Sequence, residues 1–177
     1  MSRLLVCSAV IALLTPFYAI AERDGQRDFD FEIGSWRAHL SRLDHPLAGS
    51  SHWLDYDGTS VVRTVWDGRA NIGELDVSGP AGRIQGLTIR LYDAARRQWN
   101  ITWANAAAGT LDPATMFGEF LNGRGEFFGR DSFNGRAIDV RFVFSNMTRN
   151  AFHFEQSFSA DGGTTWEVNW KAEFTRQ

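Results

Sequence analysis

Residues 126–145 of this chain read EFFGRDSFNGRAIDVRFVFS, and this stretch decides the fold class. Asn134-Gly135 stands between two segments in which apolar and polar residues alternate. A two-residue type I′ turn favours such a pair, because both of its central residues need a positive φ. Centring a hairpin on this turn places Phe127 opposite Phe142, so the stretch predicts two antiparallel strands with one aromatic face.

Similar alternating segments, punctuated by Gly, Asn and Asp, follow one another along the chain from Gly34 onward. Tight turns are expected between them, at Asp57-Gly58 and Asn122-Gly123 among others. Such a meander favours a sheet that closes on itself, because closure removes the exposed edges. We therefore expect an all-β fold, a single antiparallel up-and-down barrel of about ten strands with a short helical turn before it. Strands are predicted at 36–42, 51–56, 60–66, 72–77, 83–92, 99–105, 116–121, 126–133, 136–145, 151–159 and 165–175.

The first 21 residues are predicted to be a cleaved signal peptide, with Arg3 before an apolar run at 4–14 and a small-residue site at 19–21. The run is shorter than the roughly 20 residues that cross a bilayer, so no membrane span is expected in the mature chain. Residues 22–27 are expected to form a flexible leader and residues 28–177 a single barrel domain. A periplasmic or extracellular location follows from these predictions.

Composition and motifs argue against several function classes. The net charge is −3, and no basic run is interleaved with aromatic residues, so nucleic acid is not an expected partner. Signatures of serine hydrolases, zinc proteases and nucleotide-binding loops are missing from the sequence. The four histidines have no metal-binding spacing, so neither a metal nor a cofactor is expected. His153 as an axial haem ligand is the alternative.

Continuing the strand register through the last two hairpins collects large aromatic residues on one face. Leaving such rings in water would forgo roughly 1.5–3 kcal/mol each. We therefore expect this face to line the lumen, and a homodimer that buries it around a partly polar lumen is the alternative. The aromatic face comprises Phe127, Phe142, Phe144, Phe152, Phe154, Phe158, Trp166, Val168, Trp170 and Phe174.

The site that this arrangement predicts would hold a small, largely apolar molecule without any intrinsic chemistry. A buried amide needs a hydrogen-bond partner, so Gln156 either bonds a neighbouring strand or water, or orients the ligand. The predicted ligand-binding residues are four aromatic walls, a floor tryptophan and this amide: Phe127, Phe142, Phe154, Trp170, Trp36 and Gln156.

The opposite face offers an enzymatic alternative. The predicted register places Glu155 between Arg141 and Asn169, where a carboxylate could act as the general base of an isomerase, lyase or hydrolase. If this face is outside, the same residues form a cross-strand ion pair of about 0.2–1 kcal/mol. A third alternative is a protein-interaction module that uses exposed loops, including the segment 106–115.

Residues 159–166, SADGGTTW, match the S-x-D-x-G-x-T-W pattern of an Asp-box. A single copy predicts a hairpin and not an activity. Its glycines allow a tight bend, and Asp161 can bond the amides of its own turn. The box is expected to align the last two strands with Phe158 opposite Trp166.

Four segments resemble a bacterial family of exported, functionally uncharacterised calycin-like, or lipocalin-like, β-barrels. Gly34-Ser35-Trp36 matches the G-x-W that opens lipocalin barrels, whose tryptophan closes the barrel floor. The resemblance implies a barrel that holds a small apolar molecule, and it implies no catalytic residues. The matching segments are 28–36 (DFDFEIGSW), 65–71 (VWDGRAN), 122–127 (NGRGEF) and 158–170.

Overall fold

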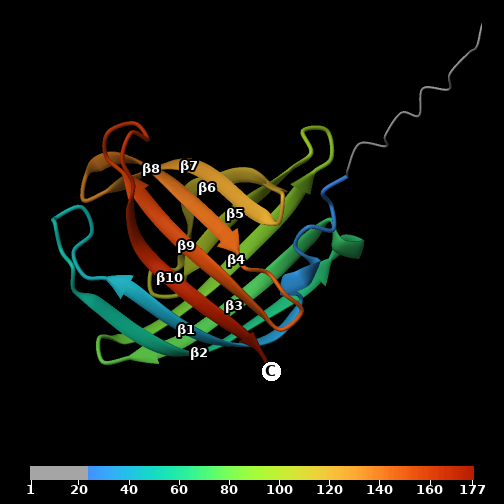
Figure 1. Ribbon diagram of the computed structural model, residues 1–177, viewed down its shortest axis with the longest axis horizontal. Helices are drawn as coiled ribbons and strands as arrows, with labels where there is room; N and C mark the ends of the chain where they lie inside the picture. The colour runs from blue at the N-terminus through green and yellow to red at the C-terminus, as the bar shows by residue number, and fades with distance from the viewer. Residues whose placement is uncertain (1–23) are drawn as a thin grey trace, which may run out of the picture.

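A computed structural model describes residues 24–177, and the predicted signal peptide lies outside this range. The chain forms a closed barrel of antiparallel strands in sequence order, with β1 and β10 paired to close it (Figure 1). The all-β up-and-down barrel predicted from the sequence is thereby confirmed. No helix within residues 24–177 is long and apolar enough to cross a membrane. The strands are β1 Gly34–Leu43, β2 Trp53–Val65, β3 Ala70–Gly79, β4 Gly82–Asp93, β5 Gln98–Asn105, β6 Thr110–Leu121, β7 Arg124–Phe133, β8 Arg136–Ser145, β9 Ala151–Ser159 and β10 Glu167–Arg176.

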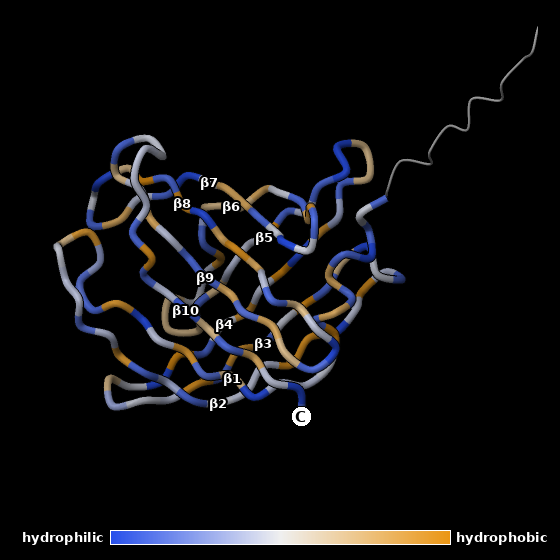
Figure 2. The backbone as a smooth tube through the Cα atoms, viewed as in Figure 1, coloured by the Kyte–Doolittle hydropathy of each residue, from blue (hydrophilic) through white to orange (hydrophobic). Residues whose placement is uncertain are grey.

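The hairpin of β7 and β8 has the predicted register. Phe127 pairs with Phe142, and Asn134 and Gly135 have φ values of 51° and 77°, as a type I′ turn requires. Apolar and polar residues alternate along the strands (Figure 2). The apolar set faces inward, and Phe127 is completely buried in the hydrophobic core. The expectation that the aromatic face lines the lumen is therefore confirmed for most of its members.

Two segments predicted to leave the sheet belong to strands instead. β2 runs through Asp57-Gly58 without a turn, because Gly58 serves a close approach between strands. A Cβ there would lie 2.0 Å from the backbone oxygen of Asp76 in β3. The predicted loop 106–115 is also shorter than expected, since β6 already begins at Thr110.

The 3-10 helix η1 (Asp30–Glu32) forms the predicted helical turn and plugs the end of the barrel where the chain also terminates (Figure 1), and a second 3-10 helix, η2 (Trp66–Gly68), follows β2. The Trp36 indole donates a hydrogen bond to the Glu32 carbonyl oxygen at 2.7 Å. Arg176 covers the Trp36 ring at 4.1 Å and donates hydrogen bonds to the carbonyl oxygens of Phe31 and Ile33. These contacts hold the plug on the G-x-W segment, as expected for a floor tryptophan.

Aromatic rings fill most of the plugged half of the barrel. The Phe29 ring, carried in by the plug, meets the rings of Trp99 and Phe120 edge to face at centroid distances of 5.1 and 4.8 Å. Trp99 also donates a hydrogen bond at 3.0 Å to the carbonyl oxygen of Gly25, within the predicted leader. The larger ligand space therefore lies towards the other end of the barrel.

Candidate functional site

A cavity of about 300 Å³ occupies the half of the lumen opposite the plug. Its walls are mainly apolar, half of the apolar residues are aromatic, and its rim carries charged residues from the strands. This combination of an apolar body with a few polar groups is typical of small-molecule sites. The aromatic members are Trp103, Phe133, Phe142, Phe154, Phe158 and Trp170, and the charged ones are Arg42, Asp112 and Asp131.

The two tryptophans of the cavity face each other from opposite sides of the barrel. The rings of Trp103 in β5 and Trp170 in β10 meet at 6.4 Å with an interplanar angle of 74°. Trp103 lies over Gly86 of β4, where a Cβ would come within 2.0 Å of the indole ring. The missing side chain at Gly86 therefore sets the position of the Trp103 wall.

A β-bulge in β10 brings an amide pair into this aromatic cavity. The register between β9 and β10 shifts between Val168 and Trp170, so that Asn169 has no partner in the ladder and turns into the lumen. Asn169 is 2% exposed, and its Oδ1 accepts a hydrogen bond from Gln156 Nε2 at 2.8 Å. Its Nδ2 has no partner among the described protein atoms and remains a buried donor.

Two carboxylates and one guanidinium lie at the mouth of the cavity. Burial, and after it the negative charge of Asp131, raise the pKa of Asp112 above its usual value. The Arg42 guanidinium lies 5.9 Å from the centre of the Trp170 ring. The rim is therefore polar, while the body of the cavity is apolar.

A buried ion pair lies between the cavity and the plug. Glu32 of the plug accepts a hydrogen bond from Arg90 of β4 at 2.9 Å, and both side chains are 5% exposed. Arg90 also donates to Asn71 Oδ1 at 2.9 Å. Burial raises the pKa of Glu32, although the charge of Arg90 and its hydrogen bond oppose that rise.

Four of the six predicted ligand-binding residues line the cavity, namely Phe142, Phe154, Gln156 and Trp170. Trp36 and Phe127 are completely buried in the plugged half beneath it and support the lumen without reaching the cavity. The sequence thus put these four side chains on the lumen side of the sheet but could not show how deep the plug extends.

The structure does not bring together the three residues of the enzymatic alternative. Arg141 pairs with Ser157, and Glu155 pairs with Val143 and Lys171, so the predicted neighbours Arg141 and Glu155 are two residues out of register. Asn169, expected beside Glu155 on the outer face, lies in the lumen instead. These three side chains form no common site.

Two residues with predicted roles lie on the outer face: Trp166, expected on the aromatic face that lines the lumen, and His153, the alternative haem ligand. Trp166 lies outside the lumen, with its ring 6.1 Å from the exposed Phe128 and 4.7 Å from the Arg141 guanidinium. Phe158 pairs with Glu167 and not with Trp166, so the hairpin at the Asp-box is already one residue out of the predicted register before the bulge adds a further shift. His153, the haem alternative, lies between Glu155 and Glu173 at 3.2 and 2.6 Å and does not line the cavity.

The sequence reasoning missed Trp103, Arg90 and Glu32. A signal for Arg90 was present, because residues 84, 86, 88 and 90 of the β4 segment share one face of a strand. An arginine on the same face as Ile84 predicts a buried charge that needs a counter-ion. Nothing local points to Glu32, which lies 58 positions away in the chain.

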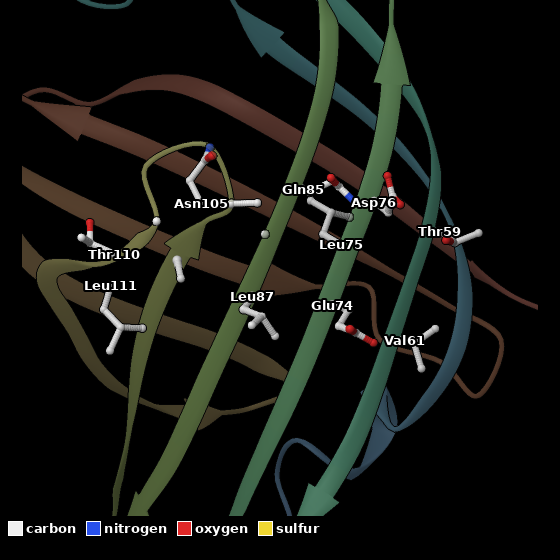
Figure 3. A pocket seen from close by; sticks show the side chains of 14 residues that line it. Thr59, Val61, Glu74, Leu75, Asp76, Gln85, Leu87, Asn105, Thr110 and Leu111 are labelled. Carbon is white, nitrogen blue, oxygen red and sulfur yellow. Dashed lines mark hydrogen bonds between the residues drawn. The ribbon is translucent and has the colours of Figure 1, made fainter.

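A second hollow lies on the outer surface of β2 to β6, beside the turn at 106–109 (Figure 3). Its volume is about 610 Å³, but its charged groups already have partners. Asp76 accepts a hydrogen bond from Arg83 at 2.7 Å, and Glu74 accepts one from Arg63 at 3.1 Å. The lumen is the stronger candidate, because it combines buried aromatic walls with a buried donor that has no partner.

Comparisons with known proteins found no match among family models or curated proteins. Among solved structures, the S-type phycobiliprotein lyase CPES from Guillardia theta is similar over 92% of this chain and 98% of that chain. The TM-score is 0.58 and the sequence identity is 14%. At this identity the similarity shows the barrel fold alone.

Proposed function

We propose that this protein is an exported carrier that binds a small, largely apolar molecule in the cavity of its barrel. The observation that carries the proposal is the aromatic cavity of about 300 Å³ with the buried amide of Asn169 facing it. That volume is at the lower end of the range of about 300–1,000 Å³ for small-molecule sites.

The polar groups favour a ligand that also has an oxygen atom. Asn169 Nδ2 is a buried donor, and satisfying it with a carbonyl or hydroxyl oxygen would remove a desolvation cost of about 1–3 kcal/mol. Gln156 holds the amide of Asn169 in this orientation through its hydrogen bond. Binding of this kind needs no covalent chemistry. This protein need not catalyse a reaction of the type that a phycobiliprotein lyase catalyses.

A fluorescence titration with N-phenyl-1-naphthylamine, a neutral apolar dye, tests the cavity. Trp170→Ala removes one wall, and the loss of about 1.5–3 kcal/mol of contact predicts roughly tenfold to a hundredfold weaker binding. Trp66→Ala is the matched control, because Trp66 is 64% exposed on the outside and should leave the affinity unchanged. Equal affinities for wild type and Trp170→Ala would refute the assignment.

Native mass spectrometry of protein purified from the cells that make it identifies the molecule itself. A retained small molecule that Trp170→Ala loses would support the carrier function. The same sample tests export, since cleavage after Ala21 predicts a mature chain that begins at Glu22.

A further inference from the structure

A smaller chamber of about 80 Å³ lies between the main cavity and the plug. It shares Ile101, Phe142, Phe154 and Trp170 with the main cavity, so the two spaces adjoin across these side chains. Its lining combines aromatic residues, three of them shared with the main cavity, with polar ones. The polar residues that line it are Glu32, Ser60, Glu74, Thr88 and Arg90, of which Glu74 is already bonded to Arg63.

The ion pair in this chamber is incompletely satisfied. Glu32 Oε1 accepts from Arg90 Nη2, and Arg90 Nη1 donates to Asn71. Glu32 Oε2 and Arg90 Nε have no hydrogen-bond partner among the protein atoms of residues 24–177. Buried polar atoms normally have partners, so one free acceptor and one free donor on the lining of the same chamber indicate a polar group that joins them.

The charges of the pair restrict what that group can be. The positive charge of the Arg90 guanidinium is already balanced by the Glu32 carboxylate at 2.9 Å. A ligand carboxylate would bring a second negative charge beside Glu32 into a buried space, which is unfavourable. A hydroxyl group is neutral and offers one donor and two acceptor lone pairs, so it can satisfy both free atoms.

We propose that the deep chamber binds the hydroxyl group of a neutral alcohol whose hydrocarbon part lies in the main cavity. This inference rests on the proposed carrier function and adds the class of ligand. The hydroxyl donates to Glu32 Oε2 and accepts from Arg90 Nε, while the apolar part contacts Trp170, Phe142 and Phe154.

Gly73 of β3 provides the space for this group and a way to test it. A Cβ at Gly73 would lie 3.4 Å from Val62 Cγ2 and 3.6 Å from Arg90 Nη1, and Gly73 lines the chamber. These are ordinary contact distances, so a side chain can be added without breaking the barrel. Gly73→Val therefore adds two methyl groups beyond this Cβ and narrows the chamber beside Arg90 without removing Glu32 or Arg90.

The experiment compares 1-decanol with decanoate by displacement of N-phenyl-1-naphthylamine from the full-length mature protein. The wild type should bind 1-decanol at least about tenfold more tightly than decanoate, as expected for one good hydrogen bond against an uncompensated charge. Gly73→Val should remove this preference and still bind the dye, which is too large for the chamber. Glu32→Gln should also weaken 1-decanol binding, because it replaces the free acceptor with a donor.

The outcomes separate this inference from the carrier function. Equal or tighter binding of decanoate, or an unchanged preference for 1-decanol in a folded Gly73→Val, would overturn the hydroxyl site while dye binding upholds the carrier. Failure of the wild type to bind the dye would overturn the carrier function itself. If Glu32→Gln does not fold, Gly73→Val decides, with its thermal unfolding midpoint showing that it is folded.

Discussion

Removing the positive charge beside Glu32 should destabilise the protein strongly and in a pH-dependent manner. Arg90→Met keeps a long flexible side chain against the rings of Phe29 and Phe144, which Arg90 covers at 4.7 and 5.8 Å. It removes the ion pair with Glu32 and the hydrogen bond to Asn71, which is 2% exposed. The variant therefore leaves a buried carboxylate without a counter-ion.

The size of the effect follows from the burial of both partners. Breaking a buried pair by removing one member costs about 3–5 kcal/mol, because the remaining charge is uncompensated. Arg90 is also the source of both influences that lower the pKa of Glu32. In the variant, only burial still acts on the Glu32 carboxyl. The pKa of Glu32 therefore rises further above its usual value of 4.5.

The sign of the pH dependence follows from proton linkage. Between the unfolded pKa of Glu32 and its raised folded pKa, the folded state binds more protons than the unfolded state. Stability therefore falls as pH rises through this window, by up to about 1.4 kcal/mol per pH unit. The window extends to higher pH in Arg90→Met than in the wild type, so the difference in stability between them is smallest in acid and grows towards neutral pH.

Urea unfolding at a series of pH values between about 5 and 8 measures this difference. Arg63→Met is the matched control, because its partner Glu74 is at 3.1 Å but both side chains are more than half exposed. That control should lose only about 0.2–1 kcal/mol. A loss below about 1 kcal/mol in Arg90→Met at neutral pH, or a loss that does not change with pH, would refute the reasoning.

Two further predictions concern the Asp-box and the Trp103 wall. Hydrogen bonds from Thr165, together with one from Ser159, lower the pKa of Asp161 to about 2. The stabilisation they give is present above its usual value of 3.8 and is lost as pH falls through about 2; carboxyl NMR that gives a pKa near 3.8 would contradict this. Gly86→Ala would displace the Trp103 ring, so dye affinity should fall and tryptophan emission should shift; unchanged values for both would count against that wall.

The sequence predicted the fold well where structure depends on neighbouring residues. Asn134-Gly135 specifies its turn locally, so the register of β7 and β8 follows from counting outward in both directions. The same reasoning was wrong at Asp57-Gly58, because a glycine can serve close approach as well as a turn. Only the presence of the Asp76 backbone beside Gly58 decides between these two uses, and that contact comes from another strand.

The candidate site was predicted in part. Alternation in β8 and β9 placed Phe142, Phe154 and Gln156 on the lumen side, and the structure agrees. Alternation wrongly placed Asn169 outside, because a bulge adds a residue that period-two counting cannot detect. The pair of Glu32 and Arg90 could not be predicted, since it depends on how the N-terminal plug enters the barrel.

Two of the polar atoms available to a ligand, on Asn169 and Glu32, arise where the regular sheet is interrupted. A strand in a closed barrel pairs its backbone groups with its neighbours, so its inward side chains supply most of the lumen chemistry, and here these are mainly aromatic. The bulge at Asn169 and the helical turn at Glu32 each add a polar group with an unused hydrogen-bonding atom. Because one lies in the main cavity and the other in the deep chamber, a ligand that satisfies both must have two separated polar atoms on an apolar frame. This requirement is stricter than hydrophobic complementarity, and it predicts that simple hydrocarbons bind less tightly than oxygenated molecules of the same size.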